Sequence, residues 1–515
     1  MDEPNPITKP SPMIRIADLM HRALKAALRR WYITLMFAII IGVPSFHLLR
    51  INAVVAKLKK DNPTVRWNTA YIRKYDPALD PYNADGAIIL SKIGEFKTIL
   101  PLMALLSEDL ELNISNLWIK DISSLRALPL KTLNLHGTQV HDLSPLEGMP
   151  LENLYLFKTP VTDLSPLKGM PLKTLDLYDT SINDISVLKD MPLQNLTLSG
   201  SKVTDISPLK GMPLKTLNIH RTKISDISAL KGMPLKNLKL FITKVTDISA
   251  LKGMPLLALN LRGSEVTDIS PLKGMPLKSL DILSTKIRDI TMLKGMPLES
   301  LEIADTNVND ISALEGMLIT SLDLRDTRVS DITALRGMPL KWLYLSMYVD
   351  DINALKGMPI KTLDLGNTRV RDISVLKEMP KLTALSLYNS RVTDISVLKG
   401  LPLKDLSLGE TQGTDLTVLK AMPLEKLRMS NPKIKDIAVL KGMSLFGLDL
   451  YATKVTDITV LKGMPLIHLS LPRTAVDIEF LRGMQTLDTI NIHSPDTFWK
   501  KYDKKKIIPG YYDDE

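Results

Sequence analysis

Hydrophobic residues recur in this chain with a period of 21 residues. In the unit LKTLDLYDTSINDISVLKDM (172–191), the segment LDL (175–177) alternates apolar, polar and apolar side chains. This alternation predicts a short strand whose two leucines face a core. Leu188 and Met191 then return to the core, and Pro192 ends the following turn. The pattern therefore predicts one strand and one tight turn in each unit.

Two polar residues of this unit have expected structural roles. The hydroxyl of Thr180, just after the strand, can hydrogen-bond to the backbone as the chain turns. Asp184 precedes Ile185 and Ser186, where it can cap one tight helical turn. This aspartate recurs eighteen times, first at a constant spacing of 21 and later with one-residue shifts, across about residues 108–485: Asp121, Asp142, Asp163, Asp184, Asp205, Asp226, Asp247, Asp268, Asp289, Asp310, Asp331, Asp351, Asp372, Asp394, Asp415, Asp436, Asp457 and Asp477.

A repeat of this length is stable only in a stack, because each unit covers the open face of its neighbour. We therefore expect an α/β solenoid of about eighteen repeats, with one parallel concave sheet, short 3-10 turns on the convex side and no second domain after residue 108. One unit, 341–353, is a residue short and has Met347 where threonine is expected, whereas Lys381 adds a residue later. We predict a kink or a changed loop at 346–350.

The unit resembles the leucine-rich repeat, LxxLxLxxNxL, with threonine in place of asparagine. The matching residues are Leu172, Leu175, Leu177, Thr180 and Ile182. The short DISxLKGM half is similar to the bacterial 21–22-residue class that includes the internalins. Closer still are the leucine-rich regions appended to bacterial receptor-like Ser/Thr kinases, which have TDLSPLKGMPLKxL units, an entry like 122–133 and an exit like 481–502. The resemblance implies a curved solenoid that binds other macromolecules.

Those proteins carry a kinase domain ahead of their repeats. Here, residues 1–107 are too short for a kinase and contain no glycine-rich loop, HRD or DFG triplet. Kinase activity is therefore not expected.

Residues 31–49, WYITLMFAIIIGVPSFHLL, contain no Asp, Glu, Lys or Arg. A helix of this length matches the thickness of a bilayer's hydrocarbon core. We favour an uncleaved transmembrane anchor over a signal peptide cleaved before Phe46 or a buried soluble helix. Residues 1–60 carry ten Lys and Arg against three acids, so seven of the net ten positive charges flank this segment.

The basic segment 1–30 includes a helical stretch, 13–30, that either lies on anionic lipid or extends into the cytoplasm. We expect a single-pass cell-membrane protein with its N-terminus inside and its repeats extracytoplasmic. The orientation depends on Arg29 and Arg30 beside the span and on the family resemblance, because basic residues flank both sides.

The remaining boundaries follow from composition. A polar, proline-punctuated linker is expected at 50–85, an apolar N-terminal cap at 86–107, repeats at 108–485, and a C-terminal cap with a charged tail at 486–515. Phe498 and Trp499 are expected to cover the last repeat.

The chain lacks the residues of common catalytic and metal sites. Cysteine is absent, and no HExxH, GxSxG or P-loop motif occurs. His136, His220 and His468 are scattered, and four repeats separate the first two, too far to share an ion. We expect no enzyme activity, no cofactor and no bound metal. The basic excess brackets the apolar segment instead of spreading along a surface, which argues against nucleic acid.

Two repeated side chains have structural explanations. The methionines at the turn position, such as Met149, Met170, Met212 and Met464, are interpreted as core fillers and not as a ligand groove. The convex lysine row is interpreted as a solvated ridge, with an anionic-polymer site as the alternative: Lys168, Lys210, Lys231, Lys252, Lys273 and Lys294.

Two patches are candidate ligand sites on the concave face. His136, Phe157 and Tyr178 occupy the same position in successive repeats, with Tyr155 beside them, and predict an aromatic strip. The second patch is an acidic ladder of Asp281, Glu302 and Asp323, which Arg325, Arg262 or a basic partner would offset. The alternative is that both patches are ordinary surface residues. We therefore expect a protein- or glycan-binding repeat domain, or else an envelope scaffold without a discrete ligand.

Overall fold

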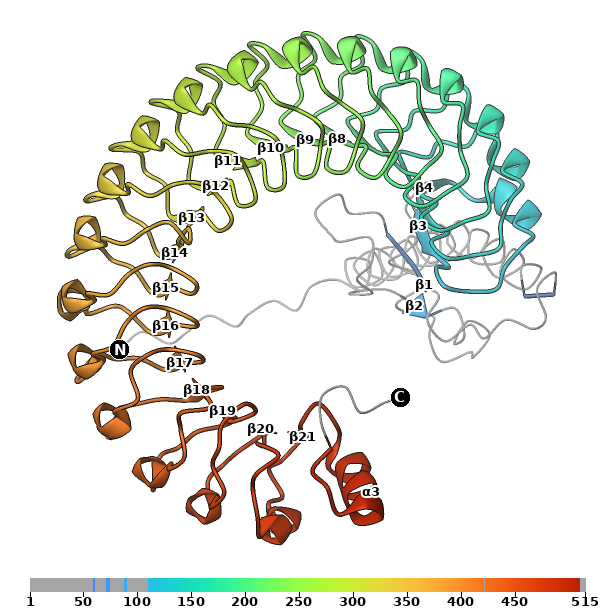
Figure 1. Cartoon of the computed structure of the whole chain (residues 1–515). Coiled ribbons are helices and arrows are strands. Elements are labelled where there is room, and N and C mark those ends of the chain that lie inside the picture. The colour runs from blue at the N-terminus through green and yellow to red at the C-terminus, as the bar shows by residue number, and fades with distance from the viewer. Residues whose placement is uncertain (1–58, 61–70, 75–87, 90–109, 421, 510–515) are drawn as a thin grey trace, which may run out of the picture. The chain divides into compact units, whose positions relative to one another are not determined.

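The structure is a computed structural model of the whole chain, and it describes residues 59–60, 71–74, 88–89, 110–420 and 422–509 (Figure 1). The chain divides into two compact units, Met1–Leu193 and Gln194–Glu515. The predicted transmembrane span 31–49 lies outside the described residues. Within the described part, no helix is both long and apolar enough to cross a bilayer.

The first unit contains four parallel strands joined by 3-10 turns. The strands are β3 (Leu110–Asn113), β4 (Leu130–Asn134), β5 (Asn153–Tyr155) and β6 (Thr174–Asp176). The turns are η2 (Ser123–Ala127), η3 (Ser144–Leu146), η4 (Ser165–Leu167) and η5 (Ser186–Leu188). The central leucines Leu133, Leu154 and Leu175 lie in register, so they stack as one row.

Two further strands precede the repeats. β1 (Tyr71–Lys74) pairs antiparallel with β3 and with β2 (Ile88–Ile89). The linker expected at 50–85 therefore contains a strand. The short segment YIRK has no hydrophobic alternation of its own, and its pairing partner lies almost 40 residues further on. Of the cap expected at 86–107, only β2 is described.

The second unit continues the same arrangement, with fifteen parallel strands and fourteen 3-10 turns among its described residues. Its parallel strands are β7 (Asn195–Thr197), β8 (Thr216–Asn218), β9 (Asn237–Lys239), β10 (Ala258–Asn260), β11 (Ser279–Asp281), β12 (Ser300–Glu302), β13 (Ser321–Asp323), β14 (Trp342–Tyr344), β15 (Thr362–Asp364), β16 (Ala384–Ser386), β17 (Asp405–Ser407), β18 (Lys426–Arg428), β19 (Gly447–Asp449), β20 (His468–Ser470) and β21 (Thr489–Ile490).

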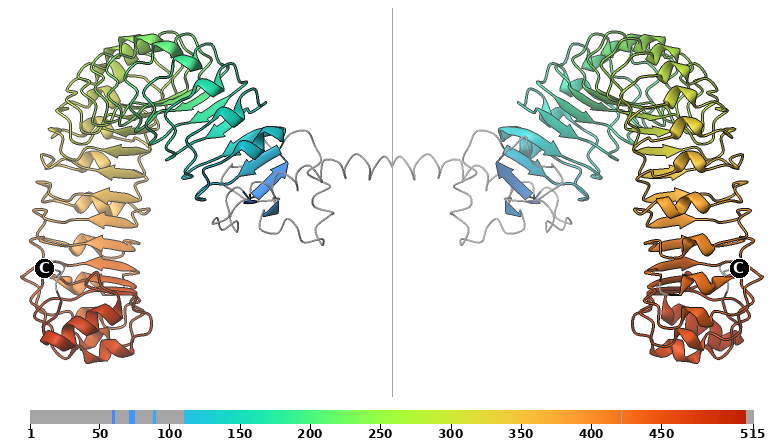
Figure 2. Two further views of the ribbon diagram at one scale, coloured as in Figure 1. Left: turned by 90° about the vertical axis from the view of Figure 1, so that its right-hand side faces the viewer. Right: turned by 90° about the vertical axis from the view of Figure 1, so that its left-hand side faces the viewer.

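Short 3-10 turns alternate with these strands: η6 (Ser207–Leu209), η7 (Ser228–Leu230), η8 (Ser249–Leu251), η9 (Ser270–Leu272), η10 (Thr291–Leu293), η11 (Ser312–Leu314), η12 (Thr333–Leu335), η13 (Asn353–Leu355), η14 (Ser374–Glu378), η15 (Ser396–Leu398), η16 (Leu416–Leu419), η17 (Ala438–Leu440), η18 (Thr459–Leu461) and η19 (Ile478–Gly483). In this unit the strands line the inside of an arc and the 3-10 turns its outside (Figures 1 and 2).

Nineteen strands thus follow residue 108 in the described chain, one more than the eighteen aspartates predict. The extra strand is β21, which lies beyond the last aspartate of the series, Asp477. Within each unit these strands are parallel, as the repeat pattern predicts.

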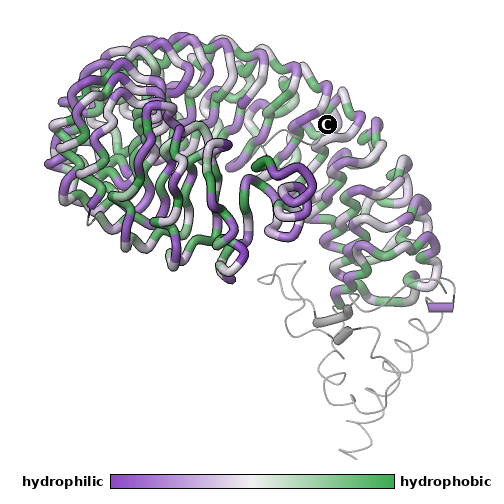
Figure 3. The backbone as a smooth tube through the Cα atoms, turned by 60° about the horizontal axis from the view of Figure 1, so that its bottom comes forward, coloured by the Kyte–Doolittle hydropathy of each residue, from purple (hydrophilic) through white to green (hydrophobic). Residues whose placement is uncertain are grey.

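The core is a continuous column of aliphatic side chains in each unit. Apolar and polar segments alternate along every repeat (Figure 3). The turn methionines Met149, Met170, Met212 and Met464 are all at most 5% exposed, which confirms that they fill the core.

The expected polar roles are also confirmed. The backbone N–H of Ser186 donates to Oδ1 of Asp184 at 2.8 Å, and the hydroxyl of Thr180 donates to the carbonyl of Leu177 at 2.7 Å. Both bonds satisfy groups that the tight turns would otherwise leave without partners. The same two bonds recur in most repeats, so each unit has its own turn restraints.

The short repeat has a changed loop, as predicted for 346–350. Regular repeats place a residue with positive φ after the strand, for example Asp305 (φ 53°) and Asp326 (φ 56°), but residues 345–349 include none. Ser346 also bonds differently, because its hydroxyl donates to the carbonyl of Thr327 in the preceding repeat at 2.8 Å. In the regular repeat before it, the hydroxyl of Thr327 instead donates to the carbonyl of Leu324 in the same repeat.

The last repeat is covered by α3 (Pro495–Lys505), whose first turn is capped by Ser494. Phe498 is completely buried and Trp499 is 8% exposed. The guanidinium of Arg482 lies 3.9 Å from the centre of the Trp499 ring. The expected burial of the two aromatic residues beyond the last repeat is confirmed.

Candidate functional site

The predicted aromatic strip is present in the first unit. The Phe157 ring lies between two others, with its centre 4.2 Å from that of His136 and 4.7 Å from that of Tyr178. Phe157 and Tyr178 meet edge to face, an arrangement that the charge distribution of aromatic rings favours. Tyr155 lies on β5 at the neighbouring outward position. All four side chains are partly exposed.

The backbone at the strand ends is held by side chains of the strands themselves. Asn134 accepts the N–H of His136 at 3.0 Å, and Asp176 accepts the N–H of Tyr178 at 2.9 Å. These bonds fix the backbone where the chain leaves each strand, and therefore the positions from which the rings of His136 and Tyr178 project. Burial raises the pKa of Asp176, an effect that its backbone bond partly offsets.

The strip is mainly an uncharged surface. Burial, with a smaller effect of Lys158, lowers the pKa of His136, so its ring is neutral at pH 7. The ammonium of Lys158 lies 5.2 Å from the centre of the Phe157 ring. Stacked rings with one cation at their edge can pack against apolar or aromatic side chains of a partner, or against the apolar faces of sugars.

A second aromatic pair occupies the same repeat position in the second unit. His220 and Phe241 are stacked with centres 3.8 Å apart and planes at 14°. His220 is only 8% exposed, and burial lowers its pKa to about 4, with smaller effects of Lys239 and Arg221. This pair was not predicted from the sequence. The repeat spacing could have indicated it, because His220 lies at the same repeat position as Tyr178, two repeats later.

The acidic ladder is also present, because Asp281, Glu302 and Asp323 are register partners on neighbouring strands. Two of its carboxylates have structural partners. Asp281 accepts the N–H of Leu283 at 3.0 Å and a side-chain bond from Asn260 at 2.8 Å. Asp281 therefore holds the backbone at the end of its strand, as Asp176 does.

Asp323 is buried and paired with Arg325. It accepts the backbone N–H of Arg325 at 3.0 Å and three hydrogen bonds from its guanidinium, the shortest at 2.6 Å. Arg325, one of the groups expected to offset the ladder, thus pairs with one of its three carboxylates. Arg325 also lies over the ring of Tyr344 at 4.7 Å.

Glu302 has a different environment from its two neighbours. Burial and the charges of Asp323 and Asp281 raise its pKa, and Arg325 and Arg262 only partly compensate. Much of the ladder therefore has a structural explanation, and Glu302 is the member that a cationic partner would stabilise most.

Chemistry requiring a metal site finds no support in the described chain, where no three His, Asp or Glu side chains are grouped to hold an ion. The sequence contains no cysteine.

A solenoid with one parallel strand and one 3-10 turn per 21 residues defines a class of repeat protein. No protein-family profile matches the chain, and neither does any curated protein sequence. Several solved structures match the chain. An LRR protein of Leptospira interrogans is 21% identical with a TM-score of 0.50, and the match covers 67% of this chain and 90% of that one.

The LRR ectodomain of the plant membrane receptor kinase GASSHO1/SCHENGEN3 from Arabidopsis thaliana is 19% identical with a TM-score of 0.55. That match covers 74% of this chain but only 52% of the plant chain. An internalin from Listeria monocytogenes is 28% identical over 57% of this chain and 86% of that one, with a TM-score of 0.49. The likeness to the Leptospira and Arabidopsis structures shows that this chain has the leucine-rich repeat fold.

Proposed function

We propose that this protein is a non-enzymatic, membrane-tethered leucine-rich repeat protein that binds a protein or glycan through the concave face of its sheet. The observation that carries the proposal is the aromatic strip of His136, Phe157 and Tyr178. Contiguous, partly exposed rings are a common feature of binding surfaces, and aromatic anchors supply much of the affinity of protein interfaces.

The comparisons support a binding role in general terms. The Arabidopsis ectodomain was solved in complex with Casparian strip integrity factor 2. Parallel strands of a repeat solenoid present a long row of side chains that a macromolecule can contact at many points. The competing proposal is an envelope scaffold or spacer, which would use the repeats for length and not for recognition.

The membrane tether is proposed from residues 31–49 and from the basic residues beside them. The repeats would then lie outside the cytoplasm, as the likeness to the leucine-rich regions of bacterial receptor-like kinases implies.

Site-specific photocrosslinking in intact cells distinguishes a receptor from a spacer. A photoreactive phenylalanine analogue replaces Phe157 in one variant and Tyr451 in a control, since Tyr451 has the same repeat position in the second unit. We expect one discrete protein or glycan adduct from position 157 and none from position 451. No adduct at either position, or the same mixture at both, would favour the spacer.

A further inference from the structure

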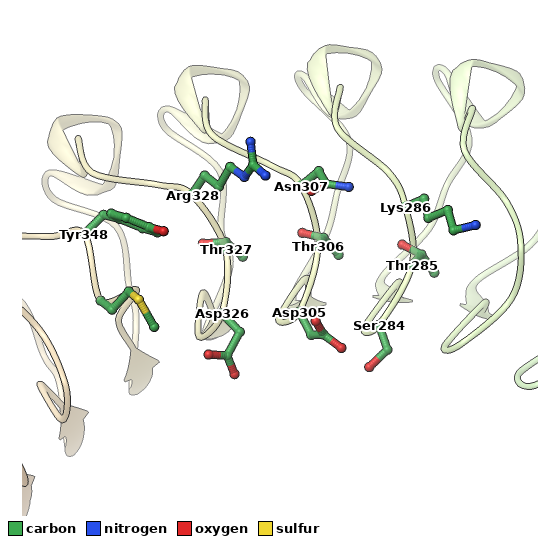
Figure 4. A pocket seen from close by; sticks show the side chains of 11 residues that line it. Ser284, Thr285, Lys286, Asp305, Thr306, Asn307, Asp326, Thr327, Arg328 and Tyr348 are labelled. Carbon is green, nitrogen blue, oxygen red and sulfur yellow. The ribbon is translucent and has the colours of Figure 1, made fainter.

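A groove of about 470 Å³ lies in the second unit, on the loops that follow β11 to β14. Figure 4 shows its two rims, each formed by one side chain from successive repeats. The lower rim consists of Ser284, Asp305 and Asp326. The upper rim consists of Lys286, Asn307 and Arg328.

The short repeat closes one end of this groove. Its loop lacks the left-handed residue of regular repeats. Met347 and Tyr348 line this end of the groove, and Figure 4 shows Tyr348 there. Both are unusually exposed for their type, at 42% and 37%. The guanidinium of Arg369 lies 5.2 Å from the centre of the Tyr348 ring, which supports that ring from the side of the next repeat.

The two rims carry opposite charges that the described chain leaves without salt bridges. Asp305 and Asp326 line the lower rim and Lys286 and Arg328 the upper one, and none of the four is in an ion pair with a described residue. Ion pairs do form elsewhere along the repeats, for example between Lys244 and Glu265 at 2.7 Å.

Several backbone N–H groups of the groove already have partners. The N–H of Asp305 donates to the carbonyl of Arg325 at 2.8 Å, and the N–H of Arg328 donates to Val308 at 2.9 Å. The rims therefore offer a ligand mainly their side chains. The left-handed backbone explains a short polar residue at 305 and 326, but asparagine would satisfy it equally, so the backbone does not explain the charge.

We propose that this groove binds a segment of a partner protein that carries a basic and an acidic side chain close together. The basic side chain lies between Asp305 and Asp326, and the acidic one lies against Lys286 and Arg328. The apolar stem of the basic residue packs on Met347 and Tyr348. This proposal rests on the proposed function only in taking a protein as the partner.

The test uses fluorescein-labelled octapeptides of glycine and serine that carry one lysine and one glutamate at different separations. Binding to the full chain is measured by fluorescence anisotropy. Each of two double variants removes both charges of one rim: Asp305→Asn/Asp326→Asn for the lower rim and Lys286→Gln/Arg328→Gln for the upper rim. The matched control is Asp179→Asn, at the same left-handed position of the first unit.

We expect at least one separation to bind, with a Kd that rises about fivefold or more in each double variant and stays constant in the control. Added salt weakens the binding. The proposal is overturned if no peptide binds up to millimolar concentration, if the double variants bind like the parent, or if lysine-only peptides bind equally well. Because photocrosslinking at position 157 uses a different surface, its result stands or falls separately.

Discussion

At the scale of single residues, the repeats show which side chains the turn geometry selects and where one departs from it. The left-handed position after the strand holds residues that adopt positive φ easily, such as Gly200, Gly263 and Asn367. Ile242 occupies the same position with a φ of 55°, although it is β-branched. Its side chain is 56% exposed, so little burial compensates for this conformation.

Replacing Ile242 with asparagine is expected to stabilise the protein by about 1 kcal/mol, because the left-handed backbone disfavours β-branched residues. The midpoint of urea unfolding measures the change. Ile242→Val keeps the β-branch and should show no gain. Equal gains in the two variants would mean that the backbone conformation at this position is not strained.

Sequence spacing predicts some of these side-chain arrangements and not others. The 21-residue period places His136, Phe157 and Tyr178 in one line, because register fixes which side chains are neighbours in a parallel sheet. It does not reveal that Asp281 and Asp323 accept the N–H two residues on, since the same carboxylates could have faced solvent. The groove could not be predicted from the sequence either. It depends on how the loop of the repeat that is one residue short orients Met347 and Tyr348.

At the scale of elements, most 3-10 turns are preceded by an aspartate whose carboxylate accepts hydrogen bonds from the first residue of the turn. Bonds from the serine or threonine two residues on lower the pKa of these carboxyls at eleven positions: Asp142, Asp163, Asp184, Asp226, Asp289, Asp310, Asp331, Asp372, Asp394, Asp415 and Asp457. A carboxyl whose pKa is lowered on folding stabilises the fold above its unfolded pKa of about 4.

That stabilisation is lost as the pH falls through the lowered, folded-state values. Burial raises the pKa of Asp176, Asp281 and Glu302, which act in the opposite direction but are fewer. We therefore expect the urea midpoint to fall between about pH 5 and pH 2. Replacing Asp289, Asp310 and Asp331 with asparagine should flatten the decline. A midpoint that is constant or rises on acidification would contradict the role of the aspartates.

The C-terminal helix gives a second prediction at this scale. Phe498→Ala should destabilise the last repeats by about 3–5 kcal/mol, because it removes a completely buried ring. In a solenoid each repeat contacts only its neighbours, so the damage should stay local. Hydrogen exchange should show lost protection near η18 to β21 and unchanged protection near β8 to β12. Uniform loss would mean that the second unit unfolds as a whole.

Local sequence patterns predicted most of the strands and turns. Strands that these patterns do not mark were missed. Strand, turn, aspartate cap and core methionine all follow from residues within one 21-residue unit. β1 was missed because its partner β3 lies far along the chain. β21 was missed because no aspartate of the series marks it.

At the scale of the whole molecule, the proposed function joins a membrane tether to a binding domain. Deleting residues 1–60 removes the apolar segment and most of the basic excess. We expect the remaining chain to fold and to stay in the supernatant after membranes are sedimented, because the repeats bury their own apolar side chains. Far-ultraviolet circular dichroism checks the fold. A folded, truncated chain that still sediments with membranes would contradict the anchor.

The most direct test of a ligand-binding surface is the affinity of the partner crosslinked at position 157. Calorimetry compares the parent with the double variant Phe157→Ala/Tyr178→Ala and with a control, Tyr388→Ala/Tyr451→Ala, at the same repeat position elsewhere. If the strip anchors the partner, the first variant loses about 2 kcal/mol or more of binding free energy and the control loses almost none. Unchanged affinity in the first variant, with its fold intact, would contradict the central claim.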